Sequence, residues 1–328
     1  MLSLKLSRLK WNVAPREANT VLRDFLAKMC SISLELSEAF IDFGCVHVNG
    51  IRTKESGYKL SANDRVELYV PSYGTKRFYE IDPQRILYRD PCLVAYNKEP
   101  FIPSHQVPYD DYNHVLGALK RFLAKEHSDP YVALHNRLDL EASGVLLFSI
   151  DKSVNWKISK MFSSHRIRKV YLLWAEGTLP GNMWSCAKAI SKKDGKYCCV
   201  DNPEKGKPAK TNFVFLCRKG SKLLLLAEPV TGRTHQIRLH ILASGLRIYG
   251  DRLYGGPTAP RLMLHGWCME LEHPHTGKAL SIKAPVPDDF LSGDFYDDEA
   301  RKIVGIHDCS SLLLSTLHND NPLIQFDS

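Results

Sequence analysis

Four apolar segments in the middle of the chain decide the fold class: VLLFSI (145–150), KVYLLWA (169–175), TNFVFLC (211–217) and KLLLLA (222–227). Each is a short apolar run of strand length, and the first three also carry the β-branched and aromatic residues typical of strands. Few of them are separated by a segment long enough to hold a helix, which parallel strands need as a crossover. The segments therefore predict a mixed or antiparallel sheet rather than a doubly wound parallel one.

The segments before these strands predict further regular elements. The stretch ILYRDPCLVAYNKEP (86–100) predicts two short strands around an Asp90-Pro91 turn. Residues 113–126 predict an amphipathic helix, because Val115, Leu119, Phe122 and Leu123 recur at helical spacing. After the four strands, apolar residues alternate with polar ones in residues 261–290 on both sides of a His-Pro-His-Thr-Gly turn, which predicts a hairpin.

The N-terminal part predicts a separate small module. Residues 1–17 are basic and are expected to be irregular. Helices are predicted from about Val21 and across residues 36–41, the second ending near Gly44. The stretch CVHVNGIRTK (45–54) contains Asn49-Gly50, a strong hairpin signal, and VELYV (66–70) predicts another strand. We expect five segments: a basic N-terminal segment (1–17), a small module (18–70), a linker (71–82), the main domain (83–292) and a tail without a functional interpretation (293–328).

Composition narrows the class of protein. The chain has 328 residues with 44% hydrophobic and 24% charged residues, which fits about two globular domains. It contains no apolar run long enough for a membrane-spanning helix and no secretory signal, although its acid-free start slightly resembles an organelle presequence. Nine cysteines without a C-x-x-C pair favour reduced thiols and a cytoplasmic location. A net charge of +8 is consistent with a polyanionic partner.

Two strand-associated segments carry groups suited to chemistry. In LHNRLDLEASGVLLFSI (134–150), Arg137 and Asp139 alternate with Leu138, so an extended backbone places both on one face, before an Ala142–Gly144 turn. A surface ion pair on a loop is the alternative. In RIRKVYLLWAEG (166–177), Lys169 and Tyr171 also share a face of the strand, and the alternative is an ordinary core aromatic.

The stretch EPVTGRTHQIRLHILASGLRIYGDRLYG (228–255) is the third such segment. It places Arg233, His235, Arg238 and His240 within eight residues, before or inside a helix expected to begin near Thr234. Guanidinium groups and a helix N-terminus both suit an anion. The spacing of the two histidines does not match a metal motif, so no metal site is expected.

A lysine-rich stretch follows the second strand segment. Between residues 188 and 210 there are seven lysines and three acids. The lysines are Lys188, Lys192, Lys193, Lys196, Lys205, Lys207 and Lys210. They predict either a solvated loop or a patch that follows a nucleic-acid backbone.

Taken in order, these motifs resemble the RluA-type family of pseudouridine synthases. The resemblance rests on NRLDLEASG, RKVYLLWAEG, TGRTHQIRLH with YGDRLYG, and RLMLHGWCMELEHPHTG with KAPVPDDF, over roughly residues 83–290. It implies an α+β domain with a mixed, mainly antiparallel sheet and a central cleft. It also implies that uridine in RNA becomes pseudouridine by detachment, rotation and reattachment of the base through carbon 5. That reaction needs no cofactor and no metal.

The same resemblance implies roles for individual residues. Asp139 would be the catalytic acid, as nucleophile or base, with Arg238 as its basic partner through a bidentate contact. Tyr171 would stack on the target base and assist proton transfer. Arg137 would hold the target nucleotide out of its helix. Arg233, His235 and Lys169 are expected to contact RNA or support the loop. The family more often has His where this chain has Asn136, so local contacts of that loop are expected to differ.

Residues 18–70 resemble the small RNA-binding domain of ribosomal protein S-four, through RDFLAK, VHVNG and SANDRVELYV. The second helix departs from that pattern, because Leu34-Glu35 stands where a basic-polar pair is usual, and the acidic Glu38 and Asp42 follow. Arg23, Lys28, Arg52 and Lys54 remain candidates for phosphate contacts. A folded module with weak or altered RNA affinity is the alternative.

Three functions follow from these observations. The first is an RNA pseudouridine synthase acting on structured RNA, either ribosomal RNA, with the large subunit favoured, or transfer RNA, without an obligatory protein partner. The second is an RNA chaperone or ribosome-assembly factor with a vestigial pocket. The third is an enzyme of free nucleotides, for which the chain lacks a phosphate loop.

Overall fold

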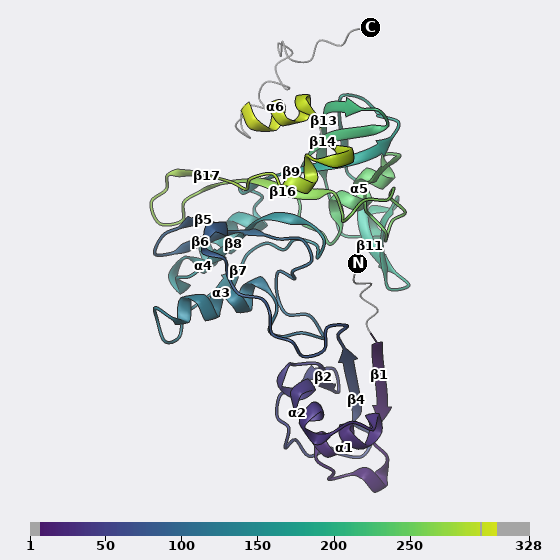
Figure 1. The fold of residues 1–328 in the computed structure, drawn as a ribbon. Coiled ribbons are helices and arrows are strands. Elements are labelled where there is room, and N and C mark those ends of the chain that lie inside the picture. Colours follow the sequence, from purple (N-terminus) through teal and green to yellow (C-terminus); the bar gives the residue numbers. More distant parts are fainter. Residues whose placement is uncertain (1–6, 296, 307–328) are drawn as a thin grey trace. The chain divides into compact units, whose positions relative to one another are not determined.

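The computed structural model describes residues 7–295 and 297–306, so the first six residues and the tail beyond residue 306 lie outside it. The chain divides into two compact units, one made of residues 1–82 and 102–132 and the other of residues 83–101 and 133–328 (Figure 1). Each unit has its own sheet and its own core.

The first unit is a small four-stranded antiparallel sheet with three helices. Its sheet has the order β1-β4-β2-β3, and two of its helices form with it a core that includes Phe25 and Ile41. The elements are β1 (Ser7–Asn12), α1 (Leu22–Cys30), α2 (Leu34–Asp42), β2 (Val46–Val48), β3 (Ile51–Arg52), β4 (Arg65–Val70) and α3 (Val115–Ala124). The predicted helices and the Asn49-Gly50 hairpin are confirmed, and both turn residues have the positive φ that this hairpin turn requires.

The expectation that residues 1–17 are irregular is wrong for residues 7–12. β1 pairs with β4 along its whole length, and Val13 just beyond it is buried. The basic residues of β1 have a structural partner: Arg8 donates a hydrogen bond to the buried Glu67 of β4, and Lys10 lies 4.0 Å from the same carboxylate. Sequence periodicity missed this strand because five of its six residues are exposed.

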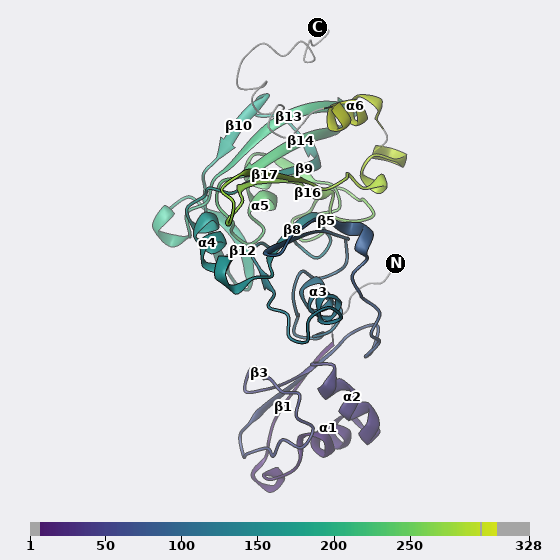
Figure 2. The same ribbon diagram turned by 90° about the vertical axis from the view of Figure 1, so that its left-hand side faces the viewer.

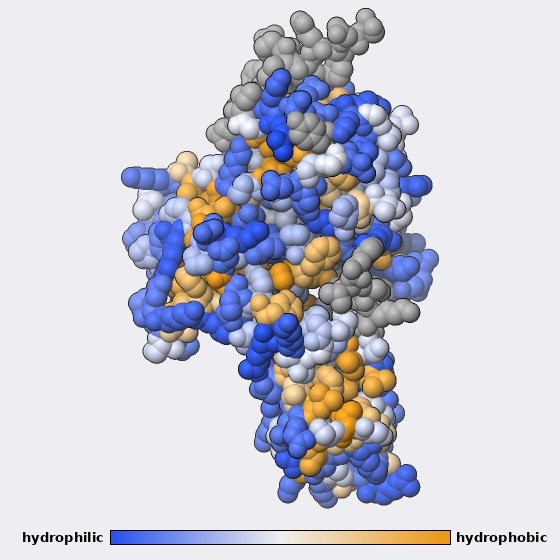
Figure 3. Space-filling view, in the orientation of Figure 1, coloured by the Kyte–Doolittle hydropathy of each residue, from blue (hydrophilic) through white to orange (hydrophobic). Residues whose placement is uncertain are grey.

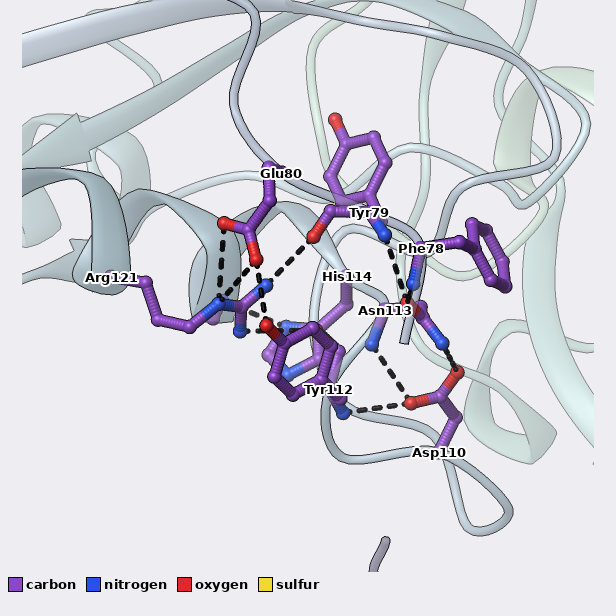
Figure 4. Close-up of polar contacts among 9 residues, drawn as sticks. Phe78, Tyr79, Glu80, Asp110, Tyr112, Asn113, His114 and Arg121 are labelled. Atoms are coloured by element: carbon purple, nitrogen blue, oxygen red, sulfur yellow. Dashed lines mark hydrogen bonds and ion pairs between the residues drawn. The ribbon is translucent and has the colours of Figure 1, made fainter. Parts of the chain in front are cut away.

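Residues 102–132 belong to the first unit, although the sequence placed them in the domain from 83 to 292. Side chains far apart in the sequence explain the difference (Figure 4). The Asn113 side chain accepts hydrogen bonds from the backbone N–H groups of Phe78 and Tyr79, at 2.8 and 3.0 Å. Arg121 of α3 bonds Glu80 and lies over the ring of Tyr112, 3.6 Å from its centroid. These contacts tie residues 102–132 to the preceding segment 71–82.

The first unit also exposes large apolar side chains, and hydrophobic surface is visible on it in Figure 3. The exposed residues are Leu9, Met29, Leu34, Leu36, Ile51 and Phe78.

The second unit contains, among the described residues, an eleven-stranded sheet. Its main path runs β10-β13-β14-β9-β16-β8-β6-β5, while β15 pairs with β9, β17 with β16 and β7 with β8. The pair β16–β8 is parallel, and the other pairs are antiparallel, which confirms the predicted mixed, mainly antiparallel sheet. The fourth apolar segment forms β14, which pairs with β13 on one side and with β9 on the other.

The strands of this unit are β5 (Ile86–Arg89), β6 (Leu93–Lys98), β7 (Ala133–Leu134), β8 (Ser143–Ser149), β9 (Arg168–Gly177), β10 (Met183–Cys186), β11 (Ala189–Lys193), β12 (Lys196–Val200), β13 (Thr211–Lys219), β14 (Lys222–Pro229), β15 (Leu246–Ile248), β16 (Leu264–Glu272) and β17 (Ala279–Lys283). The helices are α4 (Lys152–Ser163), α5 (Gln236–Ala243) and α6 (Asp298–Ile306). β11 and β12 form a separate hairpin.

β9 separates two cores because its side chains alternate between the faces of the sheet. Val170, Leu172 and Trp174 pack into one core, and Leu173 and Ala175 into the other. Tyr171 packs beside the second core, on the face that α5 covers. The predicted alternation of β9 is therefore confirmed, and it directs Tyr171 and Lys169 toward the side of the sheet where α5 lies.

Candidate active site

The loop that carries Asp139 is held by hydrogen bonds to the two residues that follow the aspartate. The Leu140 carbonyl accepts from the backbone N–H of Phe101 and from the Lys98 ammonium group, at 2.8 and 3.1 Å. The Glu141 carboxylate accepts from the backbone N–H of Leu262, at 3.2 Å. The chain turns at residues 140 and 141 and enters β8 at Ser143, so the turn expected at 142–144 lies two residues earlier.

Asn136 explains how this loop begins. Its amide donates to the Val145 carbonyl at 3.0 Å and accepts from the Leu147 N–H at 2.8 Å. The side chain thus pairs with β8 in the manner of a neighbouring strand, beyond the end of β7. This is the local contact that the chain has where the family more often has histidine.

A close approach of two glycines positions the start of β8. Gly144 pairs with Gly266 of β16 and has φ +119°. A Cβ atom at Gly144 would lie 2.2 Å from the Gly266 carbonyl oxygen, which no side chain permits. β8 and β16 therefore meet at the position where Leu138 and Tyr171 also approach Gly266.

Arg238 brings α5 to Asp139. The helix begins at Gln236, two residues later than predicted, after His235 in a left-handed conformation. One guanidinium N–H of Arg238 donates to Asp139 Oδ2 at 2.9 Å. The expected bidentate contact with Asp139 is wrong, because the other two bonds go to Asp251, from Nε at 2.8 Å and from the second terminal nitrogen at 2.6 Å. Asp251 is buried, and it holds the plane of the guanidinium.

The electrostatics of the site follow from this double pairing. Burial tends to lower the pKa of Arg238, but hydrogen bonds and charges from Asp251 and Asp139 outweigh it and raise that pKa. Burial and then the charge of Asp139 raise the pKa of Tyr171, so its phenol stays protonated at neutral pH. Burial lowers the pKa of His235, against the attraction of Asp139.

His235 and Tyr254 complete the wall beside Asp139. His235 Nε2 lies 3.9 Å from Asp139 Oδ1, and its Nδ1 is hydrogen-bonded to the Tyr254 hydroxyl at 2.8 Å. The Arg238 guanidinium lies over the Tyr254 ring, 4.9 Å from its centroid. Arg238 is thus contacted by Asp139, by Asp251 and by the Tyr254 ring, which together restrict the orientation of its guanidinium group.

A cleft of about 430 Å³ opens over this arrangement, and a volume of this size suits a small-molecule-sized group. Its lining consists of Asp139, Leu140, Glu141, His235, Arg238, Gly250, Arg252, Leu253 and Leu262. The Asp139 side chain is 25% exposed, so the carboxylate is held by Arg238 and still accessible from the cleft.

The remaining predicted site residues lie elsewhere in the second unit. Arg137 is exposed and is not among the residues lining the cleft. Arg233 is exposed, and its Nε donates to the Pro208 carbonyl at 3.0 Å. Lys169 is half-buried near Phe162, and burial lowers its pKa although Glu228 opposes this effect. The structure thus joins Asp139, Arg238 and His235, and it places Tyr171 near them through β9.

Sequence reasoning missed Lys98, a fully buried cation beneath the Asp139 loop. Its ammonium group donates to the carbonyls of Glu99 and Leu140. Burial lowers the pKa of Lys98 to about 7, although Glu99 and Asp139 act in the opposite direction. Lys98 and Asp251 both lie inside quoted motifs, but no periodicity distinguishes a buried charged residue from an exposed one.

Among the described residues, two groups contain side chains of the kinds that bind metals: Asp90, Cys92 and His273, and Cys217, Asp297 and Glu299. Neither group lines the cleft. In the first, His273 Nδ1 accepts from the backbone N–H groups of His275 and Thr276, so the ring proton lies on Nε2 and is donated to Asp90 at 2.6 Å. That nitrogen is the one a metal would need, so we interpret the group as a hydrogen-bonded link between the β5–β6 and β16–β17 turns.

Comparison with known proteins identifies the family of the chain. A family model described as RNA pseudouridylate synthase matches residues 92–243. The ribosomal large subunit pseudouridine synthase C of Pasteurella multocida (strain Pm70) is 29% identical over 300 residues, which are 85% of this chain and 87% of that protein. The protein of the same name from Buchnera aphidicola (subsp. Acyrthosiphon pisum, strain APS) is 30% identical over 220 residues, 63% of this chain and 68% of that protein. The chain belongs to the RNA pseudouridylate synthase family.

The structure of the human protein named RNA pseudouridylate synthase domain containing 4 has the same fold. It has a TM-score of 0.54 and 22% identity, and the match covers 63% of this chain and 90% of that one. The family model and the curated relatives confirm the resemblance to RluA-type pseudouridine synthases, and the protein is an RNA pseudouridine synthase. None of the helices in the described part of this synthase combines the length and apolar character needed to cross a bilayer.

Proposed function

We propose that this synthase converts uridine to pseudouridine in large-subunit ribosomal RNA, with Asp139 as the catalytic carboxylate. The contact between Arg238 and Asp139 on the wall of the cleft carries the proposal. The guanidinium orients the carboxylate through its hydrogen bond, and a carboxylate oxygen exposed to the cleft can act as a nucleophile or a base. The RNA class is supported by relatives whose names specify the large ribosomal subunit.

The other side chains have complementary proposed roles. Tyr171 stacks on the target base, and its protonated phenol serves as a proton donor or relay. Arg137, exposed on the loop two residues before Asp139, occupies the space left by the extruded nucleotide. Arg233, His235 and Lys169 contact the RNA or support the residues that do.

The lysine-rich hairpin β11–β12 supports a path for the RNA backbone. The seven lysines between residues 188 and 210 are all exposed. Tyr197 of β12 contacts the ring of His235 edge-on, with centroids 5.7 Å apart, so the hairpin borders the cleft. We propose that these lysines bind phosphates next to the target nucleotide.

For residues 18–70 we propose an S-four-like module with weak RNA affinity. All four basic side chains proposed for phosphate contacts have carboxylate partners. Arg23 pairs with Asp24 and Glu38, and Lys28 pairs with Glu17. Arg52 and Lys54 both pair with Asp111. A phosphate would have to displace these carboxylates, although each exposed pair is worth only ~0–1 kcal/mol.

The test is a map of pseudouridines in ribosomal and transfer RNA from cells with and without the gene. Loss of pseudouridine from large-subunit ribosomal RNA is the expected result, and loss confined to transfer RNA would contradict the proposed substrate. Purified protein should release tritium from carbon-5-labelled uridine in ribosomal RNA. Rescue of the gene deletion by Asp139→Ala would instead support an RNA chaperone, and activity restricted to uridine monophosphate would support a nucleotide enzyme. We also propose that the enzyme acts in the cytoplasm, which fractionation would test.

A further inference from the structure

Helix α4 exposes a tryptophan that the catalytic cleft does not use. The helix lies on the second unit (Figure 2) and buries Val154, Ile158 and Met161 against β6, β8 and β16. Trp156 is 69% exposed. The other four tryptophans, Trp11, Trp174, Trp184 and Trp267, are buried or half-buried. Tryptophan is enriched at binding surfaces, where its ring supplies apolar area and its N–H a hydrogen-bond donor.

Beyond the N-cap Asp151 of α4, the sequence around Trp156 carries positive charge without acids. From Lys152 to Ala175 the chain has six lysines and arginines and no aspartate or glutamate. Lys152, Lys157, Lys160 and Arg166 are exposed, and none forms an ion pair within the described ranges 7–295 and 297–306. This surface differs from the first unit, where Arg23, Lys28, Arg52 and Lys54 are all paired with carboxylates. The charge of α4 is therefore available to an anionic partner.

Helical spacing places the cations on both sides of the tryptophan. Lys152, Trp156 and Lys160 follow one another at intervals of four residues, so they form one stripe with steps of about 6 Å along the axis. The Lys160 ammonium group lies 4.8 Å from the Trp156 ring centroid. An aromatic ring between cations matches a nucleotide chain, in which bases and phosphates alternate.

The end of α4 leads back to the active-site strand. Phe162 stacks on His135, with centroids 6.0 Å apart and planes inclined by 6°. The Lys169 ammonium group lies 6.0 Å from the same Phe162 ring, and Tyr171 follows Lys169 on one face of β9. RNA bound along α4 would therefore lie on the same unit as the cleft and close to β9.

We propose that the exposed face of α4 binds an unpaired segment of RNA outside the catalytic cleft, with one base stacked on Trp156 and phosphates at Lys152, Lys160 and Arg166. The choice of RNA rests on the synthase activity but not on the role of Asp139 or on the ribosomal substrate. A membrane surface fits less well, because the apolar residues of α4 are buried and Trp156 alone would enter the lipid.

The test uses tryptophan fluorescence of the full chain titrated with a short single-stranded oligoadenylate. This probe contains no uridine, so a failed ribosomal substrate assignment would not affect the result. We expect saturable quenching of wild-type fluorescence, and we expect Trp156→Phe to abolish it. Trp156→Phe should still bind labelled oligoadenylate within about threefold of the wild-type affinity, as measured by fluorescence anisotropy. Trp156→Ala should weaken binding about tenfold, as expected for the loss of one base–aromatic stack. Circular dichroism of each variant checks that the fold is retained.

The charges are tested by the salt dependence of oligoadenylate binding. Lys152→Ala with Lys160→Ala should lower the slope of log affinity against log salt by about 1.4, since each single-strand phosphate contact contributes about 0.7. Lys120→Ala with Lys125→Ala removes the same charge from exposed positions at α3 and should leave the slope unchanged. Binding by Trp156→Ala within twofold of wild type, or an unchanged slope for the first pair, would overturn the proposal. Quenching by phosphatidylserine vesicles but not by oligoadenylate would also overturn it.

Discussion

Arg238 gives two of its hydrogen bonds to Asp251 and reaches Asp139 with a single N–H. The arginine is 9% exposed, and Asp251 is 3% exposed. Asp251 therefore fixes the plane of the guanidinium, and the third hydrogen bond is directed at a carboxylate that remains accessible. Asp251 thus positions Arg238, and a separate N–H of the same guanidinium contacts Asp139.

Asp139→Asn and Asp139→Ala should reduce tritium release from carbon 5 by at least about a hundredfold, because neither side chain can act as a nucleophile or base. RNA binding should persist, because the side chains proposed to bind phosphates lie outside Asp139. The measurement compares tritium release with the dissociation constant for labelled RNA. Residual turnover above a hundredth of wild type would remove Asp139 from the catalytic role.

Asp251→Asn should lower kcat about tenfold to a hundredfold with little change in KM, because Arg238 loses its orienting partner while the cleft lining stays intact. Asp251 is a positioning residue, so loss of stability alone must be separated from loss of alignment. Glu270→Gln is the matched control, since it removes one of two carboxylates bound to Arg168 of β9. Equal kcat losses in the two variants, at matched stability, would contradict the positioning role.

Tyr171→Phe should keep RNA affinity but slow tritium release about a hundredfold, since it retains the ring and removes the protonated phenol. Tyr171→Leu should in addition weaken RNA binding by ~1–3 kcal/mol through loss of stacking. Single-turnover tritium release and RNA titration separate the two effects. Wild-type release rates in Tyr171→Phe would leave the ring as the functional part of the residue.

Lys98→Met should change how stability depends on pH. The folded protein holds the pKa of Lys98 at about 7, below its value of 10.5 in the unfolded chain, so unfolding takes up a proton between these values. Stability due to Lys98 therefore rises with pH through this window and is lowest below pH 7. Between pH 7 and pH 9 the free energy of unfolding of wild type should rise by about 2 kcal/mol relative to Lys98→Met. Urea denaturation at both pH values measures this, and parallel changes in the two proteins would contradict it.

Gly144→Ala should destabilise the second unit by at least about 3 kcal/mol, from the clash with Gly266 together with the unfavourable backbone conformation. Gly195→Ala, at φ +79° in the β11–β12 turn with open space around it, is the control and should cost about 1–2 kcal/mol. Thermal and urea unfolding of both variants give the comparison. Similar losses in the free energy of unfolding for Gly144→Ala and Gly195→Ala would mean that β8 and β16 can move apart without an energetic cost.

The sequence by itself determined the elements whose signals are local. Short apolar runs identified β8, β9, β13 and β14, and Asn49-Gly50 identified the first hairpin, because apolar runs and turn chemistry depend on neighbouring residues. Family motifs singled out Asp139, Tyr171 and Arg238 as the candidate site residues, and their catalytic roles remain predictions.

The tertiary structure alone decided which distant groups meet. It assigned two bonds of Arg238 to Asp251, buried Lys98 beneath the Asp139 loop, and paired β1 with β4 through Arg8 and Glu67. It also joined residues 102–132 to the first unit through contacts such as Asn113 with Phe78. Burial and ion-pair partners depend on chain segments about a hundred residues apart or more, for example the 99 positions between Asp139 and Arg238 and the 183 between Asp90 and His273, and no local pattern records them.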